Sequence, residues 1–239
     1  MQVTALELEN YRNFERVKFS FDGNQTAVCG DNARGKSNLL ESIYFLAIGK
    51  SGRGTRDRDV VKWGTNFFSI DAVIERDKQP VPIRIAYDSQ VGKKKAFLDA
   101  TPLPRLSDLV GRFNAVLFSP EDVDLVLRDP PQRRRLLDIL VSQCNAAYLS
   151  DLDQFRRVLS QRNRLLKESN HLDSSQLAPW NAQMAEIGAR IVLARLEALD
   201  EIRPIAREYY STISATPEVL GSTYRSLVKS EERERAHEV

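Results

Sequence analysis

Short runs of alternating apolar and polar residues dominate the first 119 positions and predict β-strands. Val17 and Phe19 alternate with Lys18, which is the two-residue period of a strand with one buried face. Comparable apolar runs predict further strands at residues 3–8, 25–29, 67–74, 81–85, 96–98 and 115–118. A helix is predicted over residues 36–48, with an apolar face formed by Leu39, Leu40, Ile43, Leu46 and Ala47.

The character of the sequence changes at Ser119, where a helix is predicted to begin. Ser119 suits the N-cap and Pro120 the first helical position, and the acidic Asp122 follows at the third. The triplet Asp129-Pro130-Pro131 ends this short helix and opens the next one. From there to about residue 212 the spacing of apolar residues is helical.

Two apolar faces indicate how the later helices pack. The first face consists of Tyr148, Leu152, Phe155, Leu159 and Leu166. The second has heptad-like spacing and consists of Trp180, Met184, Ile187, Ile191, Ala194 and Ala198. Because this repeat is short, it favours antiparallel helices within one chain over a coiled coil between chains. A polar loop is predicted at residues 168–178, with Pro179 at the first position of the following helix.

These patterns divide the chain into three parts. Residues 1–119 form a sheet-rich lobe, residues 120–220 form a helical lobe, and residues 221–239 begin a return to the first lobe. A strand is predicted at residues 222–228, and the charged segment 231–238 is expected to fray. The sequence therefore predicts an α/β protein with an inserted helical lobe.

Composition narrows the class of protein. The 239 residues carry a net charge of only +2, so a nucleic-acid site would have to be a local basic patch. The positive excess falls in residues 128–168, whereas residues 169–239 are net negative. Two distant cysteines, Cys29 and Cys144, are typical of a reduced, cytoplasmic protein, and we expect Cys29 to be a buried strand residue.

Other classes are excluded by what the composition lacks. With only two histidines, a Cys/His zinc site is not expected. The first twenty residues include Glu7 and Arg12, which do not fit a signal peptide. Since no apolar run approaches the length of a membrane span, we expect no membrane association.

Residues 30–37 form the most specific motif, Gly30-Asp31-Asn32-Ala33-Arg34-Gly35-Lys36-Ser37. It follows a predicted strand and opens a predicted helix, as a phosphate-binding loop (P-loop) does. Glycines allow the backbone to approach a triphosphate, whose oxygens the loop N–H groups surround. Lys36 would reach the β- and γ-phosphates, and Ser37 would bind Mg²⁺. The helix beginning near Lys36 would direct its positive end at the phosphates.

A set of motifs in a fixed order carries a family resemblance. Around the P-loop stand Asn10-Tyr11-Arg12-Asn13-Phe14 and Lys36-Ser37-Asn38-Leu39-Leu40-Glu41-Ser42-Ile43. Further along are Gly49-Lys50-Ser51-Gly52-Arg53, Phe118-Ser119-Pro120-Glu121-Asp122 and Pro131-Gln132-Arg133-Arg134-Arg135-Leu136-Leu137-Asp138, then Gln161-Arg162-Asn163 and Glu186-Ile187-Gly188-Ala189-Arg190-Ile191. Together, from residue 1 to about 228, they resemble the RecF family of bacterial DNA replication and repair proteins.

The resemblance implies a fold and a function. RecF proteins are relatives of SMC ATPases, with an ABC-like head and a helical second lobe. They bind ATP and DNA, dimerise around ATP, hydrolyse it slowly, and help to load recombinase at gaps with RecO and RecR partners, which connects them to the SOS response to DNA damage. By position, Arg12 and Asn13 would contact the nucleotide, and the segment from Gly30 through Asn38 would hold ATP and Mg²⁺.

This chain departs from an ABC-type head in two respects. The segment 119–122 occupies the place of the glutamine loop but has no Gln, so Glu121 or Asp122 would have to substitute. An apolar strand ending in Asp-Glu and a Ser-Gly-Gln capping motif are both missing, because the Asp200-Glu201 pair falls within a predicted helix. We therefore expect the N-terminal portion of a longer protein, which by itself binds ATP weakly or not at all and does not turn it over.

Two basic clusters are candidates for DNA contact. Lys50, Arg53, Arg56 and Arg58 lie in a Gly-rich stretch after the P-loop helix, suited to contacting phosphates without reading bases. Arg133, Arg134 and Arg135 lie in the first turn of a helix, where one is expected to pair with Asp129 or Asp138. Arg156, Arg157, Arg162 and Arg164 are interpreted as the polar side of an amphipathic helix. Because aromatic residues do not interleave with these runs, duplex backbone contact is favoured over base stacking.

Two other functions remain open at this point. One is a different P-loop enzyme such as a small-molecule kinase, which would need acid and base residues near the loop. The other is a protein-interaction module with a vestigial nucleotide site. ATP-dependent DNA binding distinguishes the RecF-like function from the interaction module.

Overall fold

The computed structural model describes residues 1–127, 130–168, 174–214, 216 and 218–225. The chain divides into two compact units, residues 1–128 and 129–239, which are described separately. This division lies somewhat after the boundary expected at residue 119. Within the described residues, no helix has the length and apolar character needed to cross a membrane.

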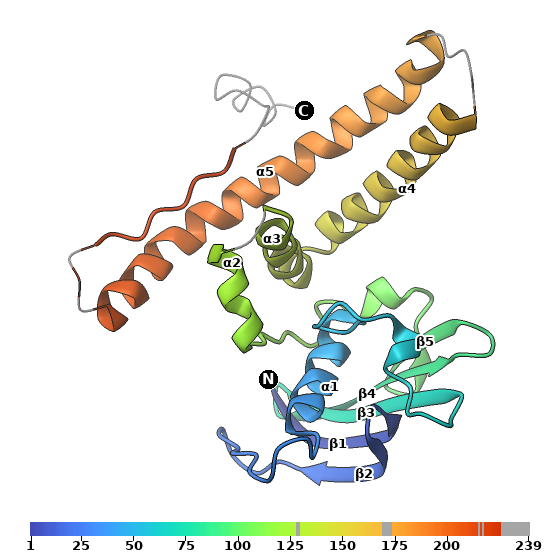
Figure 1. Ribbon diagram of the computed structural model, residues 1–239, viewed down its shortest axis with the longest axis vertical. Coiled ribbons are helices and arrows are strands. Elements are labelled where there is room, and N and C mark those ends of the chain that lie inside the picture. The colour runs from blue at the N-terminus through green and yellow to red at the C-terminus, as the bar shows by residue number, and fades with distance from the viewer. Residues whose placement is uncertain (128–129, 169–173, 215, 217, 226–239) are drawn as a thin grey trace. The chain divides into compact units, whose positions relative to one another are not determined.

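The first unit is built on one antiparallel sheet (Figure 1). Its six strands are β1 (Gln2–Tyr11), β2 (Phe14–Ser20), β3 (Phe67–Arg76), β4 (Gln79–Asp88), β5 (Lys93–Leu98) and β6 (Thr101–Pro102). They lie side by side in the order β2-β1-β3-β4-β5-β6. Two single-turn helices, η1 (Asp57–Asp59) and η2 (Leu106–Leu109), lie in the connections. Each of the predicted strands at 3–8, 17–21, 67–74, 81–85 and 96–98 coincides with one of these strands.

The core of this unit lies between the sheet and helix α1 (Lys36–Ile48), which lies across one face of the sheet (Figure 1). Cross-strand pairing places Leu8, Ile70 and Ile85 in one row, and all three are fully buried. Burial of each such side chain stabilises the fold by about 1.5–3 kcal/mol. Phe45 of α1 packs edge-on against Phe68 of β3, with ring centroids 5.5 Å apart.

Helix α1 has its predicted bounds because glycines in the left-handed region flank it. Gly35 precedes the helix at φ 104°, and Gly49 follows it at φ 71° with its N–H bonded to the Phe45 carbonyl. The predicted apolar face was partly wrong, since Leu40 is 48% exposed whereas Glu41 and Ser42 are buried. The buried carboxylate of Glu41 is satisfied by side chains from other segments, as described below.

Two predicted strands are not formed. Residues 25–29 and 115–118 have no regular secondary structure, and none of the strands in the described ranges pairs with them. An extended apolar run becomes a strand only when a neighbour accepts its backbone hydrogen bonds. Val116 and Phe118 are accordingly 84% and 85% exposed, and Cys29, expected to be buried, is exposed.

The predicted helix start after Ser119 is formed as a short turn. Helix η3 (Pro120–Val123) leads into α2 (Asp124–Leu127), and the Asp122 carboxylate accepts hydrogen bonds from both the N–H and the hydroxyl of Ser119. The Asp122 N–H in turn donates to the Ser119 carbonyl at 2.9 Å, so the two residues together hold the chain in a turn.

The second unit consists of α3 (Pro130–Cys144), α4 (Ala146–Glu168) and α5 (Ser174–Ile213). Helices α4 and α5 pack side by side, as Figure 1 shows. Their shared core includes Tyr148 and Leu152 from α4 and Ile187 and Ile191 from α5, with Trp180 packed against it. The two predicted apolar faces therefore meet within the chain, as expected.

The boundaries of α5 differ from the prediction. The loop predicted at 168–178 is shorter, because Ser174 already begins α5 and Pro179 lies inside the helix. A proline removes only one N–H donor from a helix. Because Pro179 lies close to the start of a 40-residue helix, the helix can begin before it. Residues 222–225, part of a predicted strand, are not in regular structure, and the rest of that segment and residues 231–238 lie outside the described range.

A polar cluster joins the three helices of this unit. Arg195 of α5 donates from Nε and Nη2 to the Asp138 carboxylate of α3, at 2.9 and 2.7 Å. The Tyr148 hydroxyl of α4 donates to the same oxygen of Asp138 at 2.5 Å. Burial, and then the hydrogen bond to Asp138, raise the pKa of Tyr148, because both disfavour the charged phenolate.

Candidate nucleotide site

The P-loop, residues 30–37, wraps from the unpaired segment 25–29 into the first turn of α1. Three of its residues have positive φ: Gly30 at 146°, Ala33 at 65° and Gly35 at 104°. Asp31, Asn32, Ala33 and Arg34 are exposed, and so is Ser37 in the first turn of the helix. The motif therefore forms an open turn at the helix N-terminus, the geometry that binds phosphate in other P-loops.

Gly35 is required by a close neighbour as well as by its backbone angle. A Cβ atom at this position would lie 2.7 Å from the side-chain amide atoms of Asn13 and 2.8 Å from Cζ of Phe14. Asn13 is itself held in place, since its Nδ2 donates to the Arg34 carbonyl at 3.1 Å. The turn between β1 and β2 thus packs directly against the last part of the P-loop.

Lys36 bends back over the loop that precedes it. Its Nζ donates to the carbonyls of Gly30 at 2.7 Å and Asp31 at 2.8 Å. These bonds hold the ammonium group at the mouth of the loop, where a phosphate oxygen would meet it. Contact between Lys36 and a phosphate remains a prediction.

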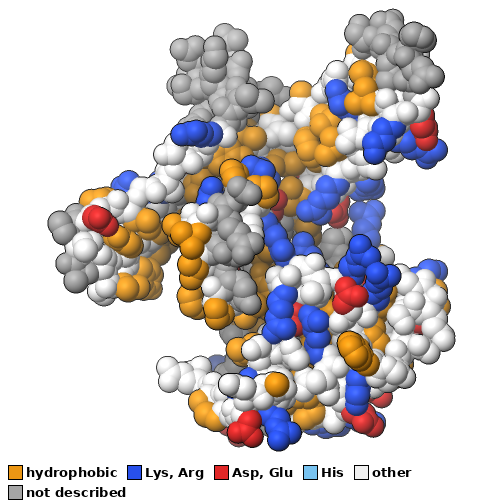
Figure 2. Space-filling model, in the orientation of Figure 1, with side chains coloured by type: hydrophobic (Ala, Val, Ile, Leu, Met, Phe, Trp, Pro, Cys, Tyr) orange, Lys and Arg blue, Asp and Glu red, His pale blue; other side chains and the backbone are white. Residues whose placement is uncertain are grey.

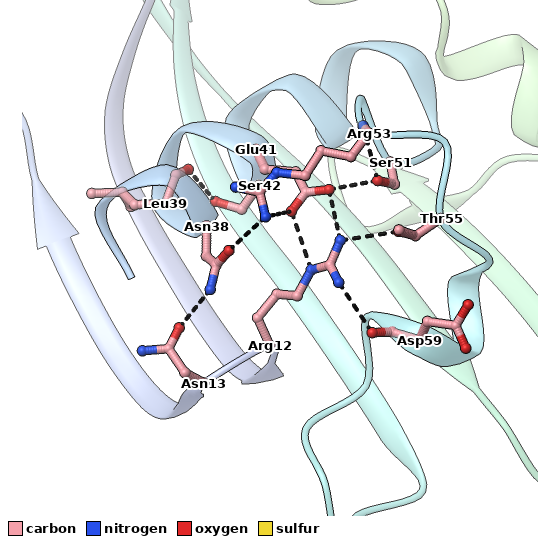
Figure 3. Close-up of polar contacts among 10 residues, drawn as sticks. All are labelled: Arg12, Asn13, Asn38, Leu39, Glu41, Ser42, Ser51, Arg53, Thr55 and Asp59. Carbon is pink, nitrogen blue, oxygen red and sulfur yellow. Dashed lines mark hydrogen bonds and ion pairs between the residues drawn. The ribbon is translucent and has the colours of Figure 1, made fainter. Parts of the chain in front are cut away.

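A chain of side-chain amides connects the P-loop to the segment after α1. Asn38 Nδ2 donates to Asn13 Oδ1 at 2.8 Å, and Arg53 Nη1 donates to Asn38 Oδ1 at 3.2 Å (Figure 3). With the bond from Asn13 to the Arg34 carbonyl, these contacts join three separate segments. Asn13 and Asn38, both predicted nucleotide-site residues, are thus brought together by the fold.

Glu41 is the centre of the polar network drawn in Figure 3. Its side chain is only 1% exposed, yet its two carboxylate oxygens accept hydrogen bonds from Arg12 at 2.9 and 3.1 Å and from the Ser51 hydroxyl at 2.5 Å. Arg53 lies 3.7 Å away as a second cationic partner. A buried carboxylate is stable only when it is paired in this way.

Arg12 is fully engaged by this network. Besides Glu41, it donates to the Asp59 carbonyl at 3.2 Å and to the Thr55 hydroxyl at 3.0 Å, and its backbone N–H donates to the Val60 carbonyl. The structure directs its guanidinium towards α1, so nucleotide contact by Arg12 stays a prediction. Sequence reasoning missed the role of Glu41, although one acidic residue on the inner side of an apolar helix was a usable signal.

Tyr11 lies behind this network and has an unusual hydroxyl. The side chain is fully buried, with edge-on ring contacts to Phe45 and Phe68. Among the described residues its hydroxyl is the one buried side-chain polar atom without a hydrogen-bond partner. Burial, and then the nearby Glu41 charge, raise the pKa of Tyr11 far above its ordinary value, so the phenol stays protonated.

The basic loop, residues 49–59, contains all four residues of the first set of predicted DNA contacts, Lys50, Arg53, Arg56 and Arg58. Lys94 of β5 fixes it by donating to the Gly49 carbonyl at 2.6 Å and to both oxygens of Asp57 at 2.8 Å. Lys50, Arg56 and Arg58 are exposed on this loop. Arg53 is also exposed, at 40% of its side chain, but it contacts Glu41 and Asn38.

The second set of predicted DNA contacts belongs to the helical unit. Arg133 and Arg134 are exposed near the start of α3. Asp138, one of two partners expected for this cluster, binds Arg195 and Tyr148, while Asp129 lies outside the described residues. Because the two units are described separately, each basic cluster stands as a surface of its own unit.

Metal binding has little support from protein side chains alone. Within the described ranges no group of three or more His, Cys, Asp or Glu residues is arranged to hold a metal ion. Ser37, the last residue of the P-loop, is exposed, and its contact with a Mg²⁺ ion carried by a nucleotide remains a prediction.

The two residues proposed from the sequence as glutamine-loop substitutes are Glu121 and Asp122. Asp122 caps the turn at Ser119, and the side chain of Glu121 lies outside the described part.

Comparison with known sequences identifies related proteins. The family described as AAA domain matches residues 5–176. The chain is 36% identical over 240 residues to the DNA replication and repair protein RecF of Staphylococcus carnosus, and 38% identical over 228 residues to that of Heliobacterium modesticaldum. It covers 64% and 61% of these two proteins, so the chain spans about three fifths of their length.

Two solved structures resemble the fold. One, described as the recombination mediator protein RecF-ATP in the RecFOR pathway, has a TM-score of 0.85 at 29% identity and covers 92% of this chain and 63% of its own. The other, the corresponding RecF-ATPrS structure, has a TM-score of 0.83 at 31% identity, covering 89% and 58%. Both similarities extend over most of the sheet-rich and helical parts together.

Proposed function

The chain belongs to the AAA domain family and to the RecF family, and from this premise we propose that it is an ATP-dependent DNA-binding protein of recombinational repair and replication. The α/β fold class expected from the sequence, an ABC/SMC-like P-loop ATPase head with a helical lobe, is thereby confirmed. Both curated relatives are named DNA replication and repair protein RecF. The names of the two solved structures include ATP or ATPrS.

The proposed nucleotide site is the P-loop, and the conformation of its last residues supports this proposal. Gly35 lies so close to Asn13 that a Cβ atom would not fit, and the Lys36 side chain bends back over the loop. This arrangement supports binding of a triphosphate by the loop amides and Lys36, with Ser37 as a ligand of Mg²⁺. ATP with Mg²⁺ is therefore the proposed cofactor.

The proposed DNA contacts are phosphate contacts. Lys50 and Arg56 on the basic loop, and Arg133 and Arg134 on α3, are exposed cations that suit a duplex backbone or the junction of duplex and single strand. Arg53 joins them only if its bonds to Glu41 and Asn38 are released. On this basis we propose that Arg56 contacts DNA, whereas Arg53, although exposed, is held by Glu41 and Asn38.

The proposed role in the cell follows from the relatives. A recombination mediator of the RecFOR pathway would act with RecR- and RecO-type partners in loading recombinase at gaps, and we propose an ATP-dependent homodimer for the protein that acts. We do not expect ATP turnover by this chain alone, because Asp200-Glu201 lies on the exposed side of α5 rather than at the end of a strand.

The two cysteines provide a test with an internal control. Cys29 immediately precedes the P-loop, Cys144 ends α3 in the other unit, and both are exposed. Millimolar MgATP should slow alkylation of Cys29 while leaving Cys144 unchanged, and Lys36→Ala should abolish the protection. A matched Lys18→Ala variant, which removes an exposed lysine from β2, should retain it. Equal rates for Cys29 with and without MgATP at saturating concentrations would remove the support for this nucleotide site.

A further inference from the structure

A further basic surface lies on α4 in the helical unit, and it shares no residue with the two predicted DNA clusters. Figure 2 shows lysine and arginine side chains gathered over this helix. The sequence predicted only the polar side of an amphipathic helix here. The structure separates Arg162 from that side, because its Nε donates to Asn181 of α5 at 2.9 Å.

Five exposed residues form what we call the α4 stripe: Arg156, Ser160, Asn163, Arg164 and Lys167. Separations of three and four residues keep them on one face of the helix, where with Leu159 and Glu168 they line a surface hollow. Arg157, whose Nε donates to the Asp153 carbonyl, does not line this hollow. The stripe thus presents three cations and two neutral hydrogen-bonding groups to solvent.

Two carboxylates pair with arginines of the stripe, but both ion pairs are exposed and therefore weak. Arg156 lies 3.4 Å from Asp153, and Arg164 lies 2.8 Å from Glu168. The two arginines are 60% and 77% exposed, and the two acids are 42% and 62% exposed. Ion pairs between such exposed groups contribute little, so the arginines can exchange these partners for a phosphate oxygen.

The composition and length of the stripe point to a phosphodiester backbone. Arginine, lysine, serine and asparagine are the side chains that contact phosphates in protein–DNA complexes. From residue 156 to residue 167 an α-helix rises about 16 Å. A duplex carries roughly nine phosphate charges over that length of axis. Since the stripe has no aromatic residue, stacking on bases has no platform here.

A membrane surface fits the same helix less well. An interfacial helix inserts its apolar face among lipids. The apolar face of α4, with Tyr148, Leu152 and Val158, is buried against the other helices of the unit. Only the polar side of α4 remains available, and it matches a ligand with a regular row of negative charges.

We propose that the α4 stripe is an additional contact surface for the backbone of duplex DNA. This inference rests on the proposed function, since it adds a site in the helical unit to the DNA binding proposed above. The proposed contact is independent of base sequence, because the stripe would bind phosphates and would not reach base edges in a groove. No residue of the stripe belongs to the unit that contains the P-loop.

The test compares two variants that remove equal charge. The first is Arg164→Gln with Lys167→Gln, both on the stripe. The control is Arg162→Gln with Arg207→Gln, in which Arg162 faces α5 and Arg207 lies near the far end of that helix. The affinity of the whole chain for a labelled duplex is measured over a range of salt concentrations, and thermal unfolding checks that both variants fold.

The stripe variant should reduce the slope of log K against log salt by about 1.8, because each phosphate that the protein no longer neutralises lowers the slope by roughly 0.9. The control should leave the slope within about 0.3 of the wild-type value. Equal slopes for the stripe variant and the wild type, with DNA still bound, would overturn this inference and leave the proposed function intact. Absence of duplex binding by the wild-type chain would overturn both. Loss of affinity for anionic vesicles or an acidic peptide, but not for DNA, would assign the stripe to another partner.

Discussion

Arg12 and Glu41 stand 29 residues apart in the sequence and form a two-armed ion pair, with Nε and Nη2 of the arginine each donating to a different oxygen of the carboxylate. The carboxylate is 1% exposed and the guanidinium 16% exposed. This pair ties the end of β1 to the P-loop helix. It also orders the segment after α1, since Ser51 and Arg53 share the same carboxylate.

Removal of this carboxylate should destabilise the first unit strongly. Glu41→Ala leaves Arg12 buried without its anion, which typically costs about 3 kcal/mol. Urea unfolding measures the change in the free energy of unfolding. As a control, Glu168→Ala breaks an exposed pair with Arg164 and should cost at most about 0.5 kcal/mol. Equal, small effects of the two substitutions would show that the Glu41 network does not stabilise the fold.

Gly35 should tolerate no side chain. Gly35→Ala adds a Cβ that meets Asn13 and Phe14 within 3 Å and also imposes strain at φ 104°, so we expect a loss of about 2–4 kcal/mol. Gly64→Ala is the matched control, because Gly64 has φ 84° but open space around it. That variant should lose only about 1 kcal/mol. Similar losses at the two sites would mean that the contact with Asn13 is unimportant.

The basic loop should show two kinds of arginine. Replacing Lys50 and Arg56 together should reduce the slope of log K for duplex binding against log salt by about 1.8. Arg53→Ala should leave that slope unchanged and instead lower the urea midpoint, because Arg53 contacts Glu41 and Asn38. A slope that falls with Arg53→Ala as much as with Arg56→Ala would place Arg53 on DNA instead.

Asp71 on the outer face of the sheet should make stability depend on pH. Burial, in the first place, raises the pKa of Asp71, while its bonds to Ser69 and Arg84 lower it less than burial raises it. A raised pKa means that the folded state binds the proton more tightly, so stability declines as the pH rises from the unfolded value through the folded one. Asp71→Asn should therefore raise the urea midpoint at pH 7 and lose this advantage near pH 3.

Glu7 provides the opposite case next to Asp71. The two residues face each other across β1 and β3, but hydrogen bonds from Lys18 and Arg16 lower the pKa of Glu7. Glu7→Gln should therefore lower the urea midpoint at pH 7, although only slightly because the pairs are exposed. A higher urea midpoint for Glu7→Gln at pH 7, or a lower one for Asp71→Asn, would contradict the directions given for the two pKa shifts.

Local signals in the sequence predicted much of this fold. Helix α1 was predicted at its observed bounds, because its limits depend on Gly35 and Gly49, which are close in sequence. The pairing of α4 with α5 followed from apolar spacing alone. Segments 25–29 and 115–118 were misassigned because a strand depends on a neighbour, and an apolar run does not reveal whether one is present.

The site was predictable only in part, for the same reason. The P-loop is contiguous, so its chemistry could be read from residues 30–37. The partners of Glu41 come from residues 12, 51 and 53, and only the folded sheet brings them together. Likewise, the pairing of Arg53 depends on that distant carboxylate. The sequence alone therefore could not show which members of the basic cluster are held by other side chains of the fold.

The proposed function is tested most directly by the affinity for duplex DNA, measured with and without saturating MgATP, in the wild-type protein and in Lys36→Ala. MgATP should strengthen DNA binding by the wild-type protein and have no effect on the variant, which lacks the ammonium group at the P-loop mouth. If the DNA affinity is the same with and without MgATP, and the same in Lys36→Ala, the proposed function is wrong.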